Sequence, residues 1–166
     1  MRLFDQKFRS QAHHYVLQSL LATLALGVIL LVQDVVLRAA IIVAVASTAF
    51  IVFAIPHTPA AGLRKVMGGH VVAVVLGSAA TGVLRALGID TFDTDRHAFY
   101  IAAAVAVGLS IFVMVVTDTE HAPAAGTALG LVIPDWSWSA VVFIIVAVIA
   151  LSALKVILGP RLVNLL

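Results

Sequence analysis

Long apolar runs alternate with short polar segments along the whole chain. The polar segments carry nearly all of the charged residues, while the runs approach the roughly 20 residues that a helix needs to cross a bilayer. The runs cover residues 16–32, 35–55, 71–88, 98–116 and 136–158. This pattern predicts an all-α fold, a polytopic transmembrane helix bundle with about five spans.

A six-residue phrase occurs twice, each time directly after an apolar run. It reads His-Thr-Pro-Ala-Ala-Gly at 57–62 and His-Ala-Pro-Ala-Ala-Gly at 121–126. Many membrane transporters are built from structural repeats. We therefore expect one transmembrane domain over residues 1–166 with an internal repeat. Its parts are an N-terminal arm and first helix (1–34), repeat unit one (35–88) and repeat unit two (98–158).

Composition excludes several classes of protein. With 63% hydrophobic and 11% charged residues and a mean hydropathy of +1.16, the chain has too little polar surface to cover a soluble globule. The absence of cysteine excludes disulfides and Cys-ligated metals. Nothing resembles a haem, flavin or nucleotide pocket, so we expect no cofactor and no enzyme activity. The net charge of +2 comes from helix ends, which indicates membrane orientation and gives no support for nucleic-acid binding.

The distribution of basic residues predicts an orientation. Lys and Arg gather in the N-terminal arm and at 64–65, whereas the loop 89–97 carries three Asp. The positive-inside rule then places the N-terminus, and both repeated phrases, on the cytoplasmic side of what we expect to be a bacterial or archaeal cell membrane.

The side of the C-terminus depends on the segment 123–133. Five full crossings leave five basic residues on each side, which is no bias at all. If residues 123–133 form a buried half-helix that crosses back, the C-terminus returns to the cytoplasm and the bias is restored. Eleven helical residues reach only about 16 Å, so this alternative needs extended chain before the half-helix.

The repeated phrases carry candidate anion-binding chemistry. Pro59 and Pro123 suit the first turn of a helix, where free N–H groups and a partial positive charge favour an anion. His57 and His121 precede these prolines, and an imidazole can donate to an anion or titrate near neutral pH. His70 could act in the same way, and three His in one layer would suit proton-coupled anion movement. The alternative is that the phrases are tight turns and that the His residues bond backbone carbonyls.

Charged residues near the phrases leave further alternatives open. Arg64 lies one turn past Pro59 and is either a membrane anchor or a substrate contact. Asp118 and Glu120, together with His121, form a metal-binding candidate that no standard ligand spacing supports.

The second phrase also resembles a known family. The stretch His-Ala-Pro-Ala-Ala-Gly-Thr-Ala-Leu at 121–129 is similar to the signature of the HPP family of integral membrane proteins. Gly68-Gly69-His70, preceded by Arg64, extends the resemblance from Ala39 to the C-terminus. Members in chloroplasts and cyanobacteria are known as nitrite transporters, which implies a small-anion substrate. The chain departs from the signature at Ala122, where the family has a second proline.

We therefore expect an integral membrane transporter or channel for a small inorganic anion, nitrite first, bound at the helix N-termini of the two phrases. The alternatives are a non-transporting membrane subunit that binds a protein partner and a divalent metal-ion carrier. The expected partners are the anion, the lipid bilayer and, given the small size of the chain, further copies in a homo-oligomer. The candidate substrate-binding residues are His57, Thr58, Pro59, Arg64, His70, His121, Pro123, Gly126 and Thr127.

Overall fold

The computed structural model describes residues 13–14, 16–18, 20–21, 39–133 and 136–165. In this part of the chain the main elements are helices, and no strand is found. They are α2 (Ala39–Ala54), α3 (Leu63–Ala86), α4 (Arg96–Val116), α5 (Ala122–Val132) and α6 (Trp138–Leu158), with the short 3-10 helices η1 (Pro59–Ala61) and η2 (Gly159–Arg161). The expected all-α bundle is confirmed. The first expected span, 16–32, lies mostly outside the described residues.

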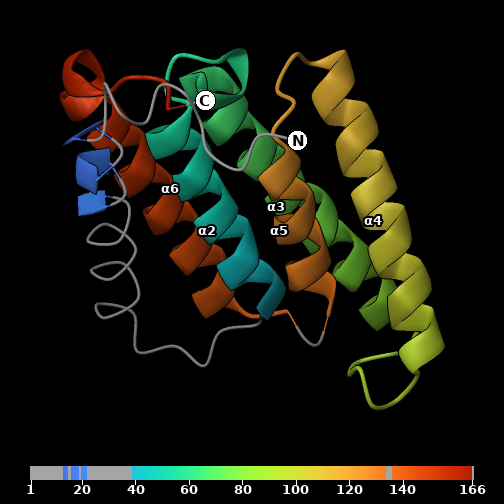
Figure 1. Ribbon diagram of the computed structural model, residues 1–166. Coiled ribbons are helices and arrows are strands. Elements are labelled where there is room, and N and C mark those ends of the chain that lie inside the picture. The colour runs from blue at the N-terminus through green and yellow to red at the C-terminus, as the bar shows by residue number, and fades with distance from the viewer. Residues whose placement is uncertain (1–12, 15, 19, 22–38, 134–135, 166) are drawn as a thin grey trace, which may run out of the picture.

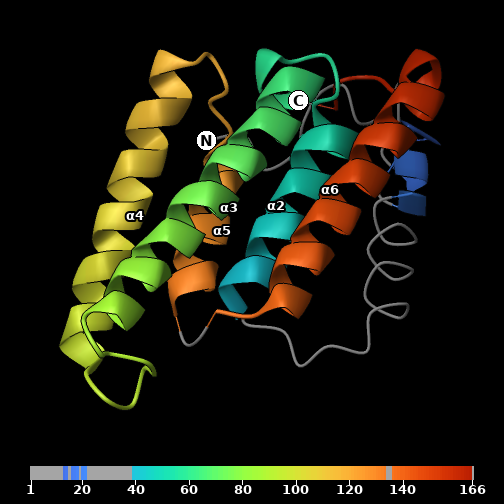
Figure 2. The ribbon, with the colours of Figure 1, turned by 180° about the vertical axis from the view of Figure 1, so that it is seen from behind.

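The helices alternate in direction (Figures 1 and 2). Helices α2, α4 and α6 run one way and α3 and α5 run the other, so both repeated phrases lie at the same end of the bundle. We call this end the phrase end; it carries residues 55–62, 117–121 and 159–165. The C-terminal tail is held there, because the backbone N–H of Leu165 donates to the carbonyl of Ala54 at 2.8 Å. The loop between α3 and α4 lies at the opposite end.

The short helix α5 packs in the angle between its neighbours, with one side left uncovered (Figure 1). It packs against α2, α3 and α4, and most of its residues are buried. Small residues permit this close packing: a Cβ on Gly130 would lie 2.5 Å from Cγ1 of Ile41, and one on Gly77 would lie 3.0 Å from the carbonyl oxygen of Ala128. The half-helix that the sequence left as an alternative at 123–133 is therefore present, and the chain returns through it to the far end before α6 begins.

Three helices in the described part are long and apolar enough to cross a membrane, namely α3, α4 and α6 continued through η2, while α2 and α5 are shorter apolar helices. Polar caps define the starts of two of them. The side chain of Asp95 accepts from the N–H groups of the first turn of α4, and that of Ser137 accepts from the first turn of α6. The helix α3 begins at Leu63, earlier than the predicted 71, because its first turns carry polar residues that lie at the phrase end.

A chain reversal ends α4 and turns the chain toward the interior. Asp118 adopts a positive φ of 55°, and the N–H of Thr119 donates to the carbonyl of Met114 at 2.8 Å. This is the Schellman arrangement, in which the left-handed residue is usually Gly. Aspartate tolerates the left-handed region better than most side chains, so the turn forms here without glycine.

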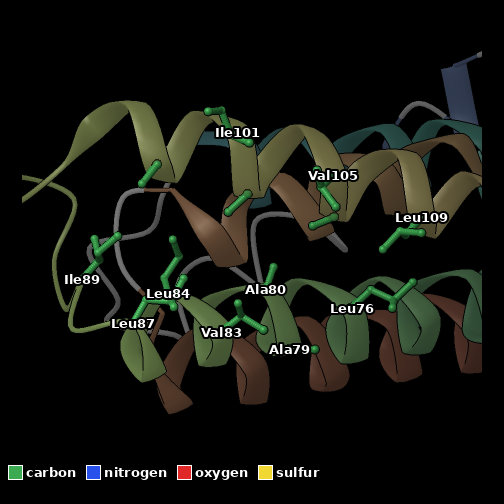
Figure 3. A pocket seen from close by; sticks show the side chains of 13 residues that line it. Leu76, Ala79, Ala80, Val83, Leu84, Leu87, Ile89, Ile101, Val105 and Leu109 are labelled. Carbon is green, nitrogen blue, oxygen red and sulfur yellow. The ribbon is translucent and has the colours of Figure 1, made fainter.

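The outer surface of the bundle is apolar, as lipid contact requires. Exposed Val, Ile, Leu and Phe side chains are spread along α4 and α6. A groove of about 450 Å³ separates the outer faces of α3 and α4, and its 13 lining residues are all apolar (Figure 3). Leu76 and Val83 line it from α3, and Ile101, Val105 and Leu109 line it from α4. Such a groove offers nothing to a polar ligand, and acyl chains can fill it.

Candidate functional site

Four buried polar side chains meet in the apolar interior. Thr48 comes from α2, His70 from α3, His121 from the N-cap of α5 and Thr127 from the next turn of α5. None is more than 2% exposed. We call these residues the His–Thr cluster. Burying so much polar surface in a membrane bundle is costly unless the groups bond one another.

Hydrogen bonds link the four side chains in a row. The Oγ1 atom of Thr48 lies 3.0 Å from Nε2 of His70 and 3.0 Å from Nε2 of His121. On the far side of each ring, Nδ1 of His70 lies 2.9 Å from Oγ1 of Thr127, and Nδ1 of His121 lies 3.2 Å from the carbonyl oxygen of Ala60 in η1. The two rings are 5.3 Å apart between centroids. Every ring nitrogen of the cluster therefore has a partner.

Two glycines on α3 make room for the segment that delivers His121. A Cβ on Gly69 would lie 2.7 Å from Cβ of His121, and one on Gly68 would lie 2.6 Å from Cγ2 of Thr119. Neither distance is compatible with a side chain. The sequence Gly-Gly-His at 68–70 thus has a physical reason: the glycines admit the second phrase against α3, and the histidine that follows bonds to it.

An exposed ion-pair group closes the phrase end above the cluster. Nζ of Lys65 binds Oδ1 of Asp118 at 3.0 Å and Oε2 of Glu120 at 2.5 Å. The hydrogen bond from Lys65 lowers the pKa of both carboxyls, Asp118 and Glu120, below the ordinary values of aspartate and glutamate side chains. Arg64 is mostly exposed and donates to the carbonyl of Thr117 at 2.7 Å. The two carboxylates of the metal hypothesis are thus bound to lysine, and no group of three metal-binding side chains is found among the described residues.

The side chains of the first repeated phrase lie outside the cluster, and the phrase reaches the cluster only through the carbonyl of Ala60. Nε2 of His57 donates to the carbonyl of Leu162 at 2.8 Å, and its backbone N–H donates to Oδ1 of Asn164 at 3.0 Å. The hydroxyl of Thr58 donates to the carbonyl of Ile55 at 2.8 Å. At η1, which begins at Pro59, the N–H groups of Ala61 and Gly62 donate to the carbonyls of Thr58 and Pro59 in the same turn. This phrase forms a tight turn that presents its carbonyls to other elements.

A hollow lies beside the N-terminus of α5. It has a volume of about 440 Å³, and α2 and the first turns of α5 line it, with Ala122, Pro123 and Gly126 on the α5 side and Ala44 and Ser47 on the α2 side. Ala44 is one helical turn from Thr48, whose hydroxyl lies 2.9 Å from the carbonyl oxygen of Ala44. The hollow therefore approaches the cluster from the outside of the α2–α5 interface.

The structure divides the residues singled out from the sequence into two groups. His70, His121 and Thr127 join the cluster, and Pro123 and Gly126 flank it on α5. The remaining four lie at the phrase end without contacting the cluster: His57, Thr58, Pro59 and Arg64. Sequence reasoning missed Thr48, the residue that connects the two rings. Its only signal was a polar atom in the small-residue stripe Ala40, Ala44, Thr48 of α2.

Comparisons with known proteins agree with this architecture. The transmembrane region of the HPP family matches residues 7–165. A transmembrane protein of Dictyostelium discoideum is 34% identical over 120 residues, which are 72% of this chain and 39% of that protein. The chain thus spans well under half the length of this relative. No solved structure matches the chain. Because the family match covers nearly the whole sequence, the chain belongs to the HPP family of integral membrane proteins.

Proposed function

We propose that the chain transports a small monovalent inorganic anion across the membrane, with nitrite as the first candidate. The observation that carries this proposal is the His–Thr cluster, a set of interlinked polar side chains inside an apolar bundle. Polar and ionisable residues at membrane depth are costly, and they commonly mark the path of a substrate or a proton. The membership of nitrite transporters in the family supports the choice of substrate.

The chemistry around the cluster suits an anion better than a cation. No carboxylate belongs to the cluster, and the two acidic side chains at the phrase end, Asp118 and Glu120, are paired with two basic ones, Lys65 and Arg64. The first turn of α5 contributes the partial positive charge of a helix N-terminus, and the hollow beside it is much larger than a triatomic ion. We place the anion between this helix start and the rings of His70 and His121, with the backbone N–H groups at the start of α5 as its first contacts.

Access to this site requires α2 and α5 to separate. Beside the hollow their contact is made by small residues, since a Cβ on Gly126 would lie 3.2 Å from Cβ of Ala44. The described conformation is closed, because each of the four side chains in the cluster is at most 2% exposed. Rocking of α2 against α5 would open the cluster through the hollow, in keeping with the alternating access of repeat-built transporters.

The charge of the two ends favours a cytoplasmic phrase end. In the described residues four basic side chains belong to that end, Arg64, Lys65, Lys155 and Arg161. The opposite end holds Arg85 and Arg96 with three Asp in the intervening loop. By the positive-inside rule we propose that the anion site opens first toward the cytoplasm, with the C-terminal tail on the same side.

Nitrite uptake into liposomes that contain the purified protein tests the proposal. Nitrous acid crosses lipid unaided, so protein-free liposomes set the background, and chloride and sulfate are tried as competitors. We expect saturable uptake above background, loss of that uptake in His70→Ala, and retention in His97→Ala, which changes an exposed histidine. Thr127→Val, which preserves shape, replaces His70→Ala if the latter does not fold. A well-folded wild-type protein without flux would refute anion transport.

That outcome would leave the subunit alternative. The apolar groove between α3 and α4 (Figure 3) is the surface on which a helix of another protein could pack. Co-purification of one stoichiometric partner from the native membrane would then support a non-transporting role.

A further inference from the structure

The partners of His121 determine which of its two ring nitrogens carries the hydrogen when the ring is neutral. A carbonyl oxygen can only accept, so the contact between Nδ1 of His121 and the carbonyl of Ala60 requires the proton to be on Nδ1. The other nitrogen, Nε2, is then a bare acceptor that faces the hydroxyl of Thr48. Neutral His121 therefore has one defined tautomer.

Thr48 has more partners than its single hydrogen can serve. Its Oγ1 lies within 3.0 Å of Nε2 of His70, Nε2 of His121 and the carbonyl oxygen of Ala44. With both rings neutral, the hydroxyl must donate to His121 and accept from His70, whose Nδ1 then accepts from Thr127. All the bonds point the same way, from Thr127 to the carbonyl of Ala60. The contact between Thr48 and Ala44 is then no hydrogen bond.

One added proton makes every one of these contacts a hydrogen bond at once. If Nε2 of His121 gains the proton, it donates to Thr48, and the hydroxyl of Thr48 rotates to donate to the carbonyl of Ala44. Oγ1 then uses its one donor and both lone pairs, which is its full capacity. No heavy atom has to move. The cluster is therefore already shaped to hold a protonated His121.

His70 is less suited to hold the proton. Protonation at its Nδ1 would force the hydroxyl of Thr127 to donate elsewhere, and no second acceptor for that hydroxyl is found among the described residues. Thr48 differs because the carbonyl of Ala44 is available to it. The asymmetry assigns the proton to the ring that belongs to the second repeated phrase.

Few charges face this site. Helices α2 and α5 and the turn η1 contain no titratable side chain. From α3 the site faces His70 and, at the phrase end, Arg64 and Lys65, which pair with Asp118 and Glu120 of the segment between α4 and α5. From α6, the ammonium of Lys155 binds the carbonyl of Ala61, next to the carbonyl that His121 uses. A cation on His121 thus has no buried counter-charge of its own.

We propose that His121 is the proton carrier of this transporter, with Thr48 as its switch, and that one proton accompanies each monovalent anion. This inference rests on the proposed function and names the coupling ion. A buried imidazolium without a counter-charge is costly, and so is a buried anion alone. Each offsets the cost of the other, so both enter the cluster together and the cycle moves no net charge.

The protonation of His121 can be measured without transport. Solid-state NMR of protein labelled with ¹⁵N in the histidine rings distinguishes bare from protonated nitrogens, and His121→Asn identifies the His121 signals by their disappearance. We expect Nδ1–H with bare Nε2 at alkaline pH and both nitrogens protonated on acidification. Nitrite should move this midpoint upward by about one pH unit, a tenfold gain in proton affinity, and Thr48→Val should lower it. An Nε2–H tautomer, or protonation of His70 first, would overturn the assignment.

Liposome assays separate the two proposals. Uptake is followed together with a trapped pH dye while valinomycin and K⁺ set the membrane potential, and protein-free liposomes are subtracted. We expect one proton per nitrite and an uptake rate that does not change with potential. Potential-driven uptake without acidification would refute proton coupling and leave transport standing, whereas the expected NMR titration without any flux would refute transport and leave the proton site standing.

Discussion

Replacing Thr48 by valine tests whether its hydroxyl joins the two halves of the cluster. Valine has nearly the same shape, so the substitution removes two hydrogen bonds without opening a cavity. Both are lost between helices, at 3.0 Å to each ring, and both leave a buried ring nitrogen without a partner. Interhelical hydrogen bonds in membranes are worth about 0.6 kcal/mol on average and up to about 1.7 kcal/mol. Two of them correspond to about 1–3 kcal/mol.

The free energy of unfolding can be measured by titrating SDS into detergent micelles and following helix content. Thr81→Val is the matched control, since Thr81 is also buried and its hydroxyl donates only to carbonyls, at 3.2 and 3.3 Å. We expect this control to cost less than about 1 kcal/mol, and Thr48→Ser to restore the ring contacts. Equal destabilisation by the two valine substitutions would show that the link between the rings contributes nothing special.

Three further outcomes follow from the packing and the ion pairs. Gly130→Ala should destabilise the bundle by about 1–3 kcal/mol in the same SDS titration, because its Cβ would lie 2.5 Å from a side-chain carbon of α2. Gly82→Ala is the control and should not destabilise it, because a Cβ there would have nothing within 4 Å. Equal effects of the two substitutions would contradict the close contact at Gly130. The pKa of Asp118 is lowered by Lys65, so the ion pair stabilises the fold at pH values above the ordinary carboxyl pKa, and this stabilisation is lost as the pH falls through the pKa of Asp118 in the folded protein. Thermal midpoints measured from pH 7 downward should therefore depend less on pH in Lys65→Met than in the wild type. The same pH dependence in both proteins would rule out a stabilising ion pair. His57→Ala should release the C-terminal tail and speed its digestion by carboxypeptidase, while His57→Gln, which keeps a donor, should digest more slowly than the alanine variant.

Hydropathy was sufficient to predict most of the helices. The spans predicted at 98–116 and 136–158 begin two residues from the observed helix starts, since capping residues lie next to the apolar runs. Hydropathy predicts the start of α3 too late. The helix begins at the phrase end, and the polar residues of its first turns lower the local hydropathy. The buried half-helix could be predicted as an alternative because its segment is apolar, rich in small residues and too short to span the membrane alone.

The cluster could be predicted only in part. The repeated phrase and the resemblance to the HPP signature pointed to His70, His121 and Thr127, whereas Thr48 reads as one more small residue in a packing stripe. The repeated phrases show the limit most clearly. Their His-x-Pro-Ala-Ala-Gly sequences are nearly identical, yet His121 is buried against α2 and α3 and His57 bonds the C-terminal tail. Local sequence specifies the turn, but the elements packed opposite decide what its histidine contacts.

The shortness of α5 has a consequence for how the protein is made. Its 11 residues are fewer than the 17 or so that insert as an independent span, so α5 enters the bundle only when α2, α3 and α4 are already there to receive it. Until then the orientation of α6 across the membrane is not fixed by α5. An α6 inserted in the opposite direction would leave Lys155 and Arg161 on the side of the membrane opposite the phrase end. The side on which the C-terminal tail is found thus reports whether biogenesis has been completed. A tag on that tail would reveal, in living cells, mutations that leave α5 outside the bundle.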